Sequence, residues 1–318
     1  MAVMKMLEGM RVLVLGAGGF VGSAICRELR KQGAIVQGFG RNITYGDSIE
    51  DEILWTNGNL SDDMALSKAI VGQNIVFHLI NSSLPESSNH NPASDLSANT
   101  LPTLSLLELC KNEGVKKIVF ASSGGAVYGI PEKTPIPENA QTDPISAYGI
   151  SKLSIEKYLN LYYRLYGLNY HIFRVANPYG PYQSPFRKQG VIAVTMHRIL
   201  NNLPIEIYGN DKIVRDYVYV DDVARLLVSG IEYNGEHRVM NVGSGIGLSI
   251  DDVITQIEKT LRVSKQSRNY RSYRAADVPI SILDISLAKH EMNWSPQVSL
   301  ADGLARTANW MKSSFSKN

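Results

Sequence analysis

The chain has 318 residues, of which 44% are hydrophobic and 19% charged, a composition typical of a folded globular protein. Its 32 basic and 30 acidic residues leave a formal net charge of +2, without the polybasic stripe that nucleic acid or an anionic membrane would attract. The length suits two domains or one large α/β unit.

The apolar stretch at residues 12–26 resembles the core of a signal peptide, but its glycines recur at fixed spacing, so we assign it to the fold. No segment approaches the roughly 18 unbroken apolar residues of a membrane helix. Cys26 and Cys110 lie too far apart in sequence to suggest a metal pair or a disulfide framework. The sequence therefore predicts a cytoplasmic protein with buried cysteines and no metal, membrane or nucleic-acid partner.

Short β-branched runs alternate with longer amphipathic segments in the first half of the chain. These runs predict strands at residues 11–16, 34–40, 74–80, 117–123 and 170–176. The intervening segments, such as 20–33, have helical periodicity. This rhythm indicates right-handed crossovers, and hence an α/β fold with a doubly wound parallel (Rossmann) sheet that binds ligands beyond the carboxyl ends of its strands.

After Ala176 the rhythm loosens into proline- and glycine-rich loops, a helix from Val191 and the strand IEIYG. A further helix and strand, DDVARLLVSGIEY and RVMNVG, are predicted to return to the large sheet. We therefore expect a dinucleotide-binding domain of residues 1–176 plus 218–243. Residues 177–217 plus 244–318 would form a smaller mixed α/β substrate-binding domain.

Three glycines, Gly16, Gly19 and Gly22, stand between the first predicted strand and the first helix, with Phe20 and Val21 among them. Glycines at such a turn let backbone amides approach a pyrophosphate at the helix N-terminus. The pattern predicts a dinucleotide site; the alternative is a tightly packed glycine turn without a ligand.

The second predicted strand ends in GFGRN rather than in the Asp or Glu that would hold the adenosine ribose of NAD. A guanidinium suits a 2′-phosphate, so Arg41, with Asn42 beside it, favours NADP. A surface arginine without a ligand is the alternative interpretation.

Tyr148 and Lys152 lie four residues apart in a segment with helical periodicity, so they share one face of the helix. An ammonium beside a phenol favours the phenolate and lets tyrosine exchange a proton with a substrate hydroxyl. Tyr208 and Lys212 have the same spacing but bracket a turn sequence. The first pair is therefore the catalytic candidate.

Five separated motifs occur along the chain in this order: GAGGFVG after a strand, SSGGAVYG at a strand end, AYGISK, NPYGP and RDYVYVDDVA. Extended short-chain dehydrogenase/reductases have motifs of this kind in the same order, and the chain therefore resembles them. It looks most like UDP-galactose 4-epimerases and related nucleotide-sugar enzymes. The resemblance runs from about Arg11 into the C-terminal region.

The resemblance implies that Tyr148 transfers the proton and that Lys152 holds the nicotinamide ribose and tunes the tyrosine. It also implies a serine, Ser122 or Ser123, that donates a hydrogen bond to the sugar oxygen; Gly124 occupies the position of the family's catalytic serine, so we favour Ser123. The further cofactor contacts that it implies are Asn59, Leu60, Leu79, Ile80, Asn99 and Val175.

The cofactor is NAD or NADP, because the epimerase resemblance indicates NAD whereas Arg41 favours NADP. The segment after the fourth strand, HLINSS, also departs from the small-residue version of the family. For the substrate, the resemblance implies a UDP- or dTDP-linked sugar. Its contacts would be Asn177, Val191, Ile207 and Tyr208, with Arg215 and Arg274 on the pyrophosphate. A homodimer through helices starting near Ser97 and Ser146 is also expected.

Sugar dehydratases of this superfamily need an acidic pair before the VYG element, where this chain has Gly125 and Ala126. The leading hypothesis is therefore a nucleotide-sugar 4-epimerase that transiently oxidises C4. An NADPH-dependent 4-ketoreductase of a nucleotide-linked 4-keto-6-deoxy sugar is the second hypothesis. A non-catalytic NAD(P) sensor is the third.

Overall fold

The computed structural model of the chain describes residues 6–41, 53–83, 85–186, 189–209, 213–272 and 278–315. Three residues named above, Asn42, Lys212 and Arg274, lie outside these ranges.

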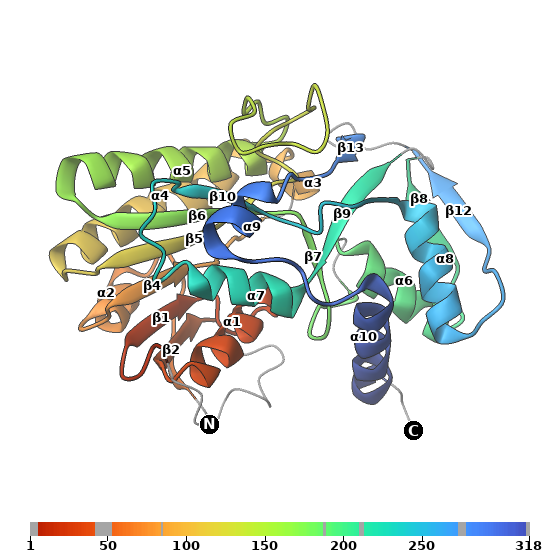
Figure 1. Ribbon diagram of the computed structural model, residues 1–318, viewed down its shortest axis with the longest axis horizontal. Helices are drawn as coiled ribbons and strands as arrows, with labels where there is room; N and C mark the ends of the chain where they lie inside the picture. The colour runs from red at the N-terminus through yellow and green to blue at the C-terminus, as the bar shows by residue number, and fades with distance from the viewer. Residues whose placement is uncertain are drawn as a thin grey trace.

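A seven-stranded sheet forms the centre of the larger part of the molecule (Figure 1). Its strands, in spatial order, are β10 (Val239–Val242), β6 (Asn169–Val175), β5 (Lys117–Ser123), β4 (Ile75–His78), β1 (Arg11–Leu15), β2 (Ile35–Gly40) and β3 (Leu54–Asn57). Every neighbouring pair is parallel. This arrangement confirms the predicted doubly wound sheet, and its strand order reverses between β1 and β4, where ligands bind in such folds.

Helices cover both faces of this sheet. On one face lie α1 (Phe20–Lys31), α7 (Val220–Ser229) and α9 (Ser286–Met292); on the other lie α2 (Asp63–Ile70), α4 (Pro92–Asn112) and α5 (Ala147–Tyr166). A short helix, α3 (Pro85–Ser88), precedes α4. The chain thus returns to the large sheet through α7 and β10, as the sequence pattern predicts.

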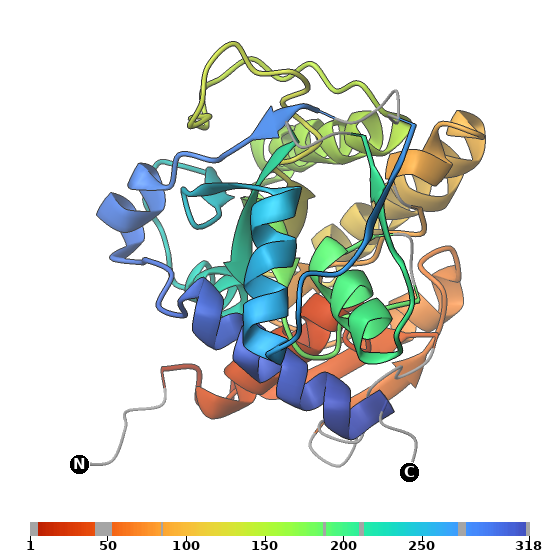
Figure 2. The ribbon, with the colours of Figure 1, turned by 90° about the vertical axis from the view of Figure 1, so that its right-hand side faces the viewer.

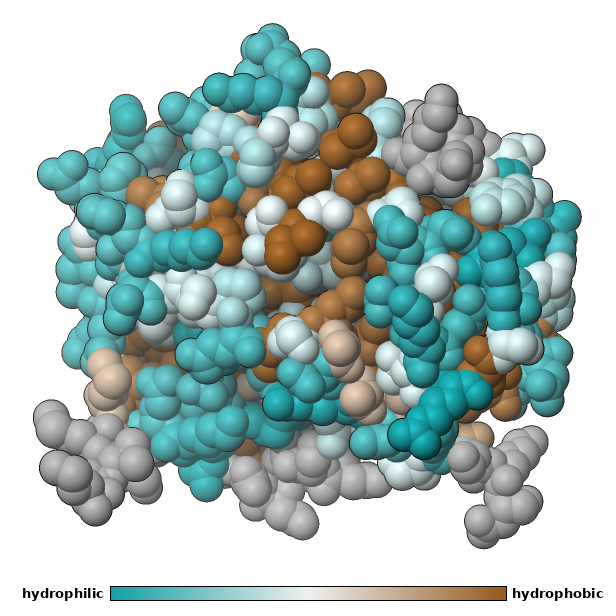
Figure 3. Space-filling view, turned by 45° about the vertical axis from the view of Figure 1, so that its right-hand side comes forward, coloured by the Kyte–Doolittle hydropathy of each residue, from teal (hydrophilic) through white to brown (hydrophobic). Residues whose placement is uncertain are grey.

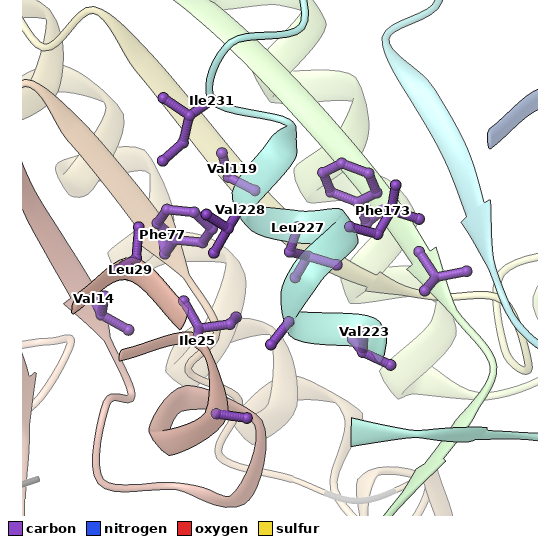
Figure 4. Packing of buried hydrophobic residues seen from close by; sticks show 14 of the residues in the cluster. Val14, Ile25, Leu29, Phe77, Val119, Phe173, Val223, Leu227, Val228 and Ile231 are labelled. Atoms are coloured by element: carbon purple, nitrogen blue, oxygen red, sulfur yellow. The ribbon is translucent and has the colours of Figure 1, made fainter. Parts of the chain in front are cut away.

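The packing of α1 follows from its amphipathic sequence. Its apolar residues Ile25 and Leu29 are fully buried, while its last turn carries Arg30 and Lys31. Figure 4 shows Ile25 and Leu29 gathered with Phe77 of β4 and with Leu227 and neighbouring residues of α7. Burying a large apolar side chain contributes about 1.5–3 kcal/mol, so this layer holds α1 against the large sheet.

The smaller part has its own sheets and core (Figure 2). Strand β9 (Val214–Tyr219) pairs with β7 (Asn177–Tyr179), β11 (Gly247–Ser249) and β13 (Ile280–Ser281), and β8 (Ile205–Tyr208) pairs with β12 (Arg268–Arg271). The helices packed around them are α6 (Val191–Leu200), α8 (Ile250–Leu261) and α10 (Leu300–Phe315).

The buried carboxylate of Asp216 joins segments of the smaller part that are distant in sequence. It accepts hydrogen bonds from the backbone amides of Ser244, Gly245 and Leu283, at 2.7, 3.1 and 3.3 Å. Burial raises the pKa of Asp216 above its usual value, against these hydrogen bonds. Because Arg215 directly precedes Asp216 on β9, this hydrogen-bond network also fixes the position from which the Arg215 side chain projects.

Figure 3 shows hydrophilic side chains around the edges of one face and hydrophobic side chains gathered towards its middle. Both cysteines are buried, as predicted. Among the described helices, none is both long enough and apolar enough to cross a membrane.

Candidate active-site cleft

A cleft of about 1240 Å³ lies between the carboxyl ends of the large-sheet strands and the smaller part. Most of the residues singled out from the sequence line it. These are Gly16, Gly19, Phe20, Val21, Gly22, Arg41, Asn59, Leu60, Leu79, Ile80, Tyr148, Asn177, Val191, Ile207, Tyr208 and Arg215.

The glycine loop is built so that only glycine fits at two positions. Gly16 has a φ of +91°, in the region that favours glycine. A Cβ on Gly22 would lie 2.1 Å from the carbonyl oxygen of Gly16, so the helix could not approach the loop with any other residue there. The residues of the loop therefore allow the close backbone approach that a dinucleotide pyrophosphate needs.

The N-terminus of α1 opens from this loop towards the cleft. Its N-cap, Gly19, makes no side-chain capping bond, and the first turn carries no acidic residue. The first amides of a helix lack intrahelical acceptors and attract anions. The site thus fits a dinucleotide phosphate at the place that the sequence predicts.

The adjoining wall comes from the ends of β2, β3 and β4. Exposed Arg41 follows β2, and Leu79 and Ile80 follow β4. The wall continues through Asn81, Ser82 and Ser83, the last residues of the HLINSS segment that departs from the family pattern, although none of the three was predicted as an individual contact. Their position directly after a predicted parallel strand was the available signal.

Tyr148 enters the cleft from the first turn of α5, which is held at several points. The hydroxyl of Ser88 accepts a hydrogen bond from the Tyr148 amide at 3.0 Å, and the side-chain oxygen of Asn89 accepts one from the Ala147 amide at 2.8 Å. Ser146 caps the helix by accepting from the Gly149 amide. The short helix α3 and the loop after it thereby fix the register of the tyrosine.

Lys152 lies behind the tyrosine, buried at 3% exposure. Its Nζ donates to the carbonyl oxygen of Ala121 at 2.9 Å and lies 5.9 Å from the centre of the Tyr148 ring. Burial lowers the pKa of Lys152 to about 8, against the opposing effect of Glu156 and Asp95.

The pKa of the Tyr148 phenol is subject to opposing effects. Burial raises its pKa to about 12, a hydrogen bond with Ser123 lowers the pKa, and the charge of Asp95 raises it. A phenol whose pKa is raised in this way keeps its proton at neutral pH in the absence of substrate.

Ser122 and Ser123 are adjacent on β5, so their side chains project from opposite faces of the strand. The hydroxyl of Ser122 donates to Glu156 at 2.5 Å, whereas Ser123 is bonded to Tyr148. Glu156 also forms a buried ion pair with Arg174 at 2.7 Å. Of the two serines, Ser123 is the one that the structure brings to the tyrosine.

Gly124 occupies the position where the resemblance places a serine. A Cβ there would lie 2.4 Å from Cδ1 of Leu283 and 3.2 Å from the carbonyl oxygen of Arg174, so a side chain at this position would require Leu283 to shift. The hydroxyl next to Tyr148 comes instead from the preceding residue, Ser123.

Three predicted cofactor residues, Lys152, Asn99 and Val175, are buried and do not line the cleft, and neither Ser122 nor Ser123 lines it. The side-chain oxygen of Asn99 accepts two hydrogen bonds from Ser82, one from its amide and one from its hydroxyl, each at 2.8 Å. Asn99 therefore supports the cleft wall from behind in this structure.

A family model described as the NAD dependent epimerase/dehydratase family matches residues 12–243. The chain belongs to this family. The match spans the glycine loop, the serine strand and the Tyr148–Lys152 helix, so the resemblance read from the separated motifs is confirmed.

Individual members of the family match over nearly the whole chain. A UDP-glucose 4-epimerase of Mycolicibacterium smegmatis is 33% identical over 311 residues, covering 95% of this chain and 99% of its own. The crystal structure of a UDP-glucose 4-epimerase from Thermotoga maritima with UDP-glucose superposes with a TM-score of 0.91 at 35% identity, covering 96% of this chain and 100% of its own. The Thermus thermophilus UDP-glucose 4-epimerase in complex with NAD gives 0.89 at 32% identity, with the same two coverages.

Proposed function

We propose that the protein is an NAD(P)-dependent nucleotide-sugar 4-epimerase that acts on a UDP-linked hexose. The observation that carries the proposal is that Tyr148 lines the same cleft as the glycine loop, with Ser123 hydrogen-bonded to its phenol and the Lys152 ammonium buried behind its ring. The activities named for the aligned relatives support the same reaction.

The proposed chemistry begins with proton transfer. Tyr148 removes the proton from the O4′ hydroxyl of the sugar, while the Ser123 hydroxyl donates a hydrogen bond to the same oxygen. A nicotinamide dinucleotide, when bound, supplies a hydride acceptor and donor for C4′. After the keto sugar has rotated in the cleft so that its other face is presented, Tyr148 returns its proton to O4′ of the epimer.

Lys152 makes this proton transfer feasible at neutral pH. Its ammonium is held by Ala121 behind the phenol ring. With a pKa of about 8, the lysine is predominantly charged at pH 7. A cation at this position favours the phenolate and so acts in the opposite direction to burial, which raises the pKa of Tyr148.

The nucleotide part of the substrate would lie along the smaller part of the protein. Asn177, Val191, Ile207 and Tyr208 line that end of the cleft, and Arg215 offers a guanidinium of the kind that binds diphosphates. The same contacts would suit a UDP- or dTDP-linked sugar; the named relatives favour UDP.

NAD is the proposed working cofactor, since the family description and an aligned structure name it. Exposed Arg41 at the end of β2 lines the cleft. We propose that this guanidinium lets the site accept a 2′-phosphate, so that NADP also binds. The same arginine is what favours an NADPH-dependent 4-ketoreductase as the second candidate.

We also propose a homodimer through α4 and α5, which pack side by side. Their outer surfaces expose Leu101, Leu161 and Leu165, at 53%, 42% and 60%. Exposed apolar groups of this kind mark association surfaces. Light scattering at micromolar concentration should give twice the chain mass, and Leu161→Lys should lower it; a monomer for the parent protein contradicts this proposal.

Incubation of the purified protein with UDP-glucose, without added reductant, tests the function. An epimerase converts it to a mixture with UDP-galactose, and neither total sugar nor cofactor is consumed. A ketoreductase would instead oxidise stoichiometric NADPH with a 4-keto sugar nucleotide. A panel of UDP- and dTDP-sugars that gives neither result would contradict both enzymatic proposals.

A further inference from the structure

Asp95 is a buried acidic residue whose charge acts on both Tyr148 and Lys152. It lies on α4 at 4% exposure. One carboxylate oxygen accepts a hydrogen bond from the Ser151 hydroxyl at 2.5 Å; the other accepts from the Ser83 hydroxyl and from the side-chain amide of Asn99 at 3.2 Å. Burying a carboxylate is costly unless donors compensate it, and here three donors do.

Each of these donors belongs to a part of the site. Ser151 is the residue before Lys152 and lies one helical turn after Tyr148. Ser83 ends the wall segment 81–83, and Asn99 holds Ser82 of the same segment. The carboxylate thus connects the cleft wall after β4 to the catalytic turn of α5.

We propose that Asp95 is a positioning residue for Tyr148 and Lys152. Its hydrogen bonds connect the wall segment 81–83 to α5, and its negative charge acts on both residues. The inference deepens the proposed epimerase function and rests on it for its catalytic meaning. Its geometry, however, is independent of any substrate.

The charge of Asp95 acts on both members of the pair. It raises the pKa of Tyr148 and that of Lys152, so it favours the neutral phenol and the charged ammonium together. Glu156 on α5 also raises the pKa of Lys152, while Ser123 on β5 lowers that of Tyr148. From β4, buried His78 faces Lys152 but stays neutral, because burial lowers its pKa to about 3.

The functional consequence concerns the strength of Tyr148 as a base. A phenolate that is too stable would be too weak a base to remove the proton from O4′, and the nearby carboxylate strengthens the base by raising the pKa of Tyr148. At the same time the lysine remains a cation despite its burial. Asp95 would thereby balance Tyr148 between its two roles as base and acid.

The test reads the ionisation of residue 148 directly. A fluorinated tyrosine, whose intrinsic pKa is lower than that of tyrosine, is incorporated at position 148, and its ¹⁹F resonance is followed with pH in the absence of substrate. Asp95→Asn keeps the size and removes the charge, so the apparent pKa should fall by about half a unit to one unit. Ser151→Ala, the matched control, removes one hydrogen bond to Asp95 and keeps the carboxylate charge. It should shift the apparent pKa of residue 148 by less than half as much.

An unchanged pKa in folded Asp95→Asn, or an equal shift in Ser151→Ala, overturns the charge role. If Asp95→Asn does not fold, Ser83→Ala tests the positioning role, because it removes the hydrogen bond between the wall segment 81–83 and Asp95 and leaves the carboxylate in place. The dissociation constant for NAD, measured by calorimetry, should then rise at least about threefold; an unchanged constant overturns the positioning role. Neither measurement needs turnover, so a protein inactive on every sugar nucleotide would contradict the proposed function without deciding this inference.

Discussion

The ammonium nitrogen of Lys152 lies 5.9 Å from the centre of the Tyr148 ring, and the two residues are one helical turn apart on α5. Because the Ala121 carbonyl also holds the lysine, the cation stays behind the phenol rather than reaching into solvent. The pair is thus arranged to change the acidity of the tyrosine without occupying the substrate space.

Replacing the phenol hydroxyl should remove proton transfer and little else. We expect Tyr148→Phe to lower kcat by about a hundred- to ten-thousandfold, with nucleotide-sugar affinity nearly unchanged. Steady-state kinetics, together with thermal melts of both proteins, measure this. Lys212→Ala is the matched control, since the turn sequence around it predicts no catalytic role; a larger loss of kcat in that variant would refute the assignment.

The two adjacent serines should separate into a catalytic and a structural effect. Ser123→Ala removes the hydroxyl next to Tyr148 and should lower kcat about ten- to a hundredfold, the effect of one hydrogen bond to a charged group. Ser122→Ala removes a donor from buried Glu156 and should cost about 1–3 kcal/mol of stability with kcat nearly unchanged. The reverse pattern would show that Ser122 is the catalytic serine.

The preference for the cofactor should depend on Arg41. Arg41→Ala is expected to weaken NADP binding about tenfold, while NAD binding changes little, because only the 2′-phosphate pairs with the guanidinium. Fluorescence titration with NADH and NADPH gives both constants. If the parent protein binds NAD about a hundredfold tighter than NADP, the interpretation of GRN as a 2′-phosphate site is wrong.

Stability should fall below about pH 6.5 because two histidines are buried in the neutral form. Burial, together with the charge of Lys152 for His78 and of Lys117 and Arg238 for His171, lowers both pKa values to about 3. An unfolded histidine takes up its proton near pH 6.5, so each contributes stability that is complete above that pH and is lost as the pH falls towards 3.

His171→Phe isolates one of these contributions, since Phe keeps the stacking against Phe173. The loss of unfolding free energy between pH 7 and pH 5 should be smaller in this variant by about 2 kcal/mol. Urea unfolding of the protein at the two pH values measures it. Exposed His290→Gln should leave the loss unchanged, and an equal loss in His171→Phe would contradict the prediction.

Much of the architecture follows from local patterns in the sequence. Residues 118–121 of β5 are continuously apolar because both faces of a parallel strand are buried, and the amphipathic period of residues 20–31 predicts the helix α1. The glycine loop could be predicted because the spacing of Gly16, Gly19 and Gly22 reflects backbone contacts within a few residues. Tyr148 and Lys152 could be paired because a helix brings residues i and i+4 together.

Other features depend on contacts between distant segments and could be decided only by the tertiary structure. Which serine faces Tyr148 depends on the pleat of β5 relative to α5, and a shift of one residue would exchange Ser122 for Ser123. Asp95 carries no motif of its own; it lies near Lys152 because α4 and α5 pack side by side on the same face of the sheet. Sequence periodicity reports which face of a helix is buried, whereas the partner of a buried polar group is chosen by the packing of the whole fold.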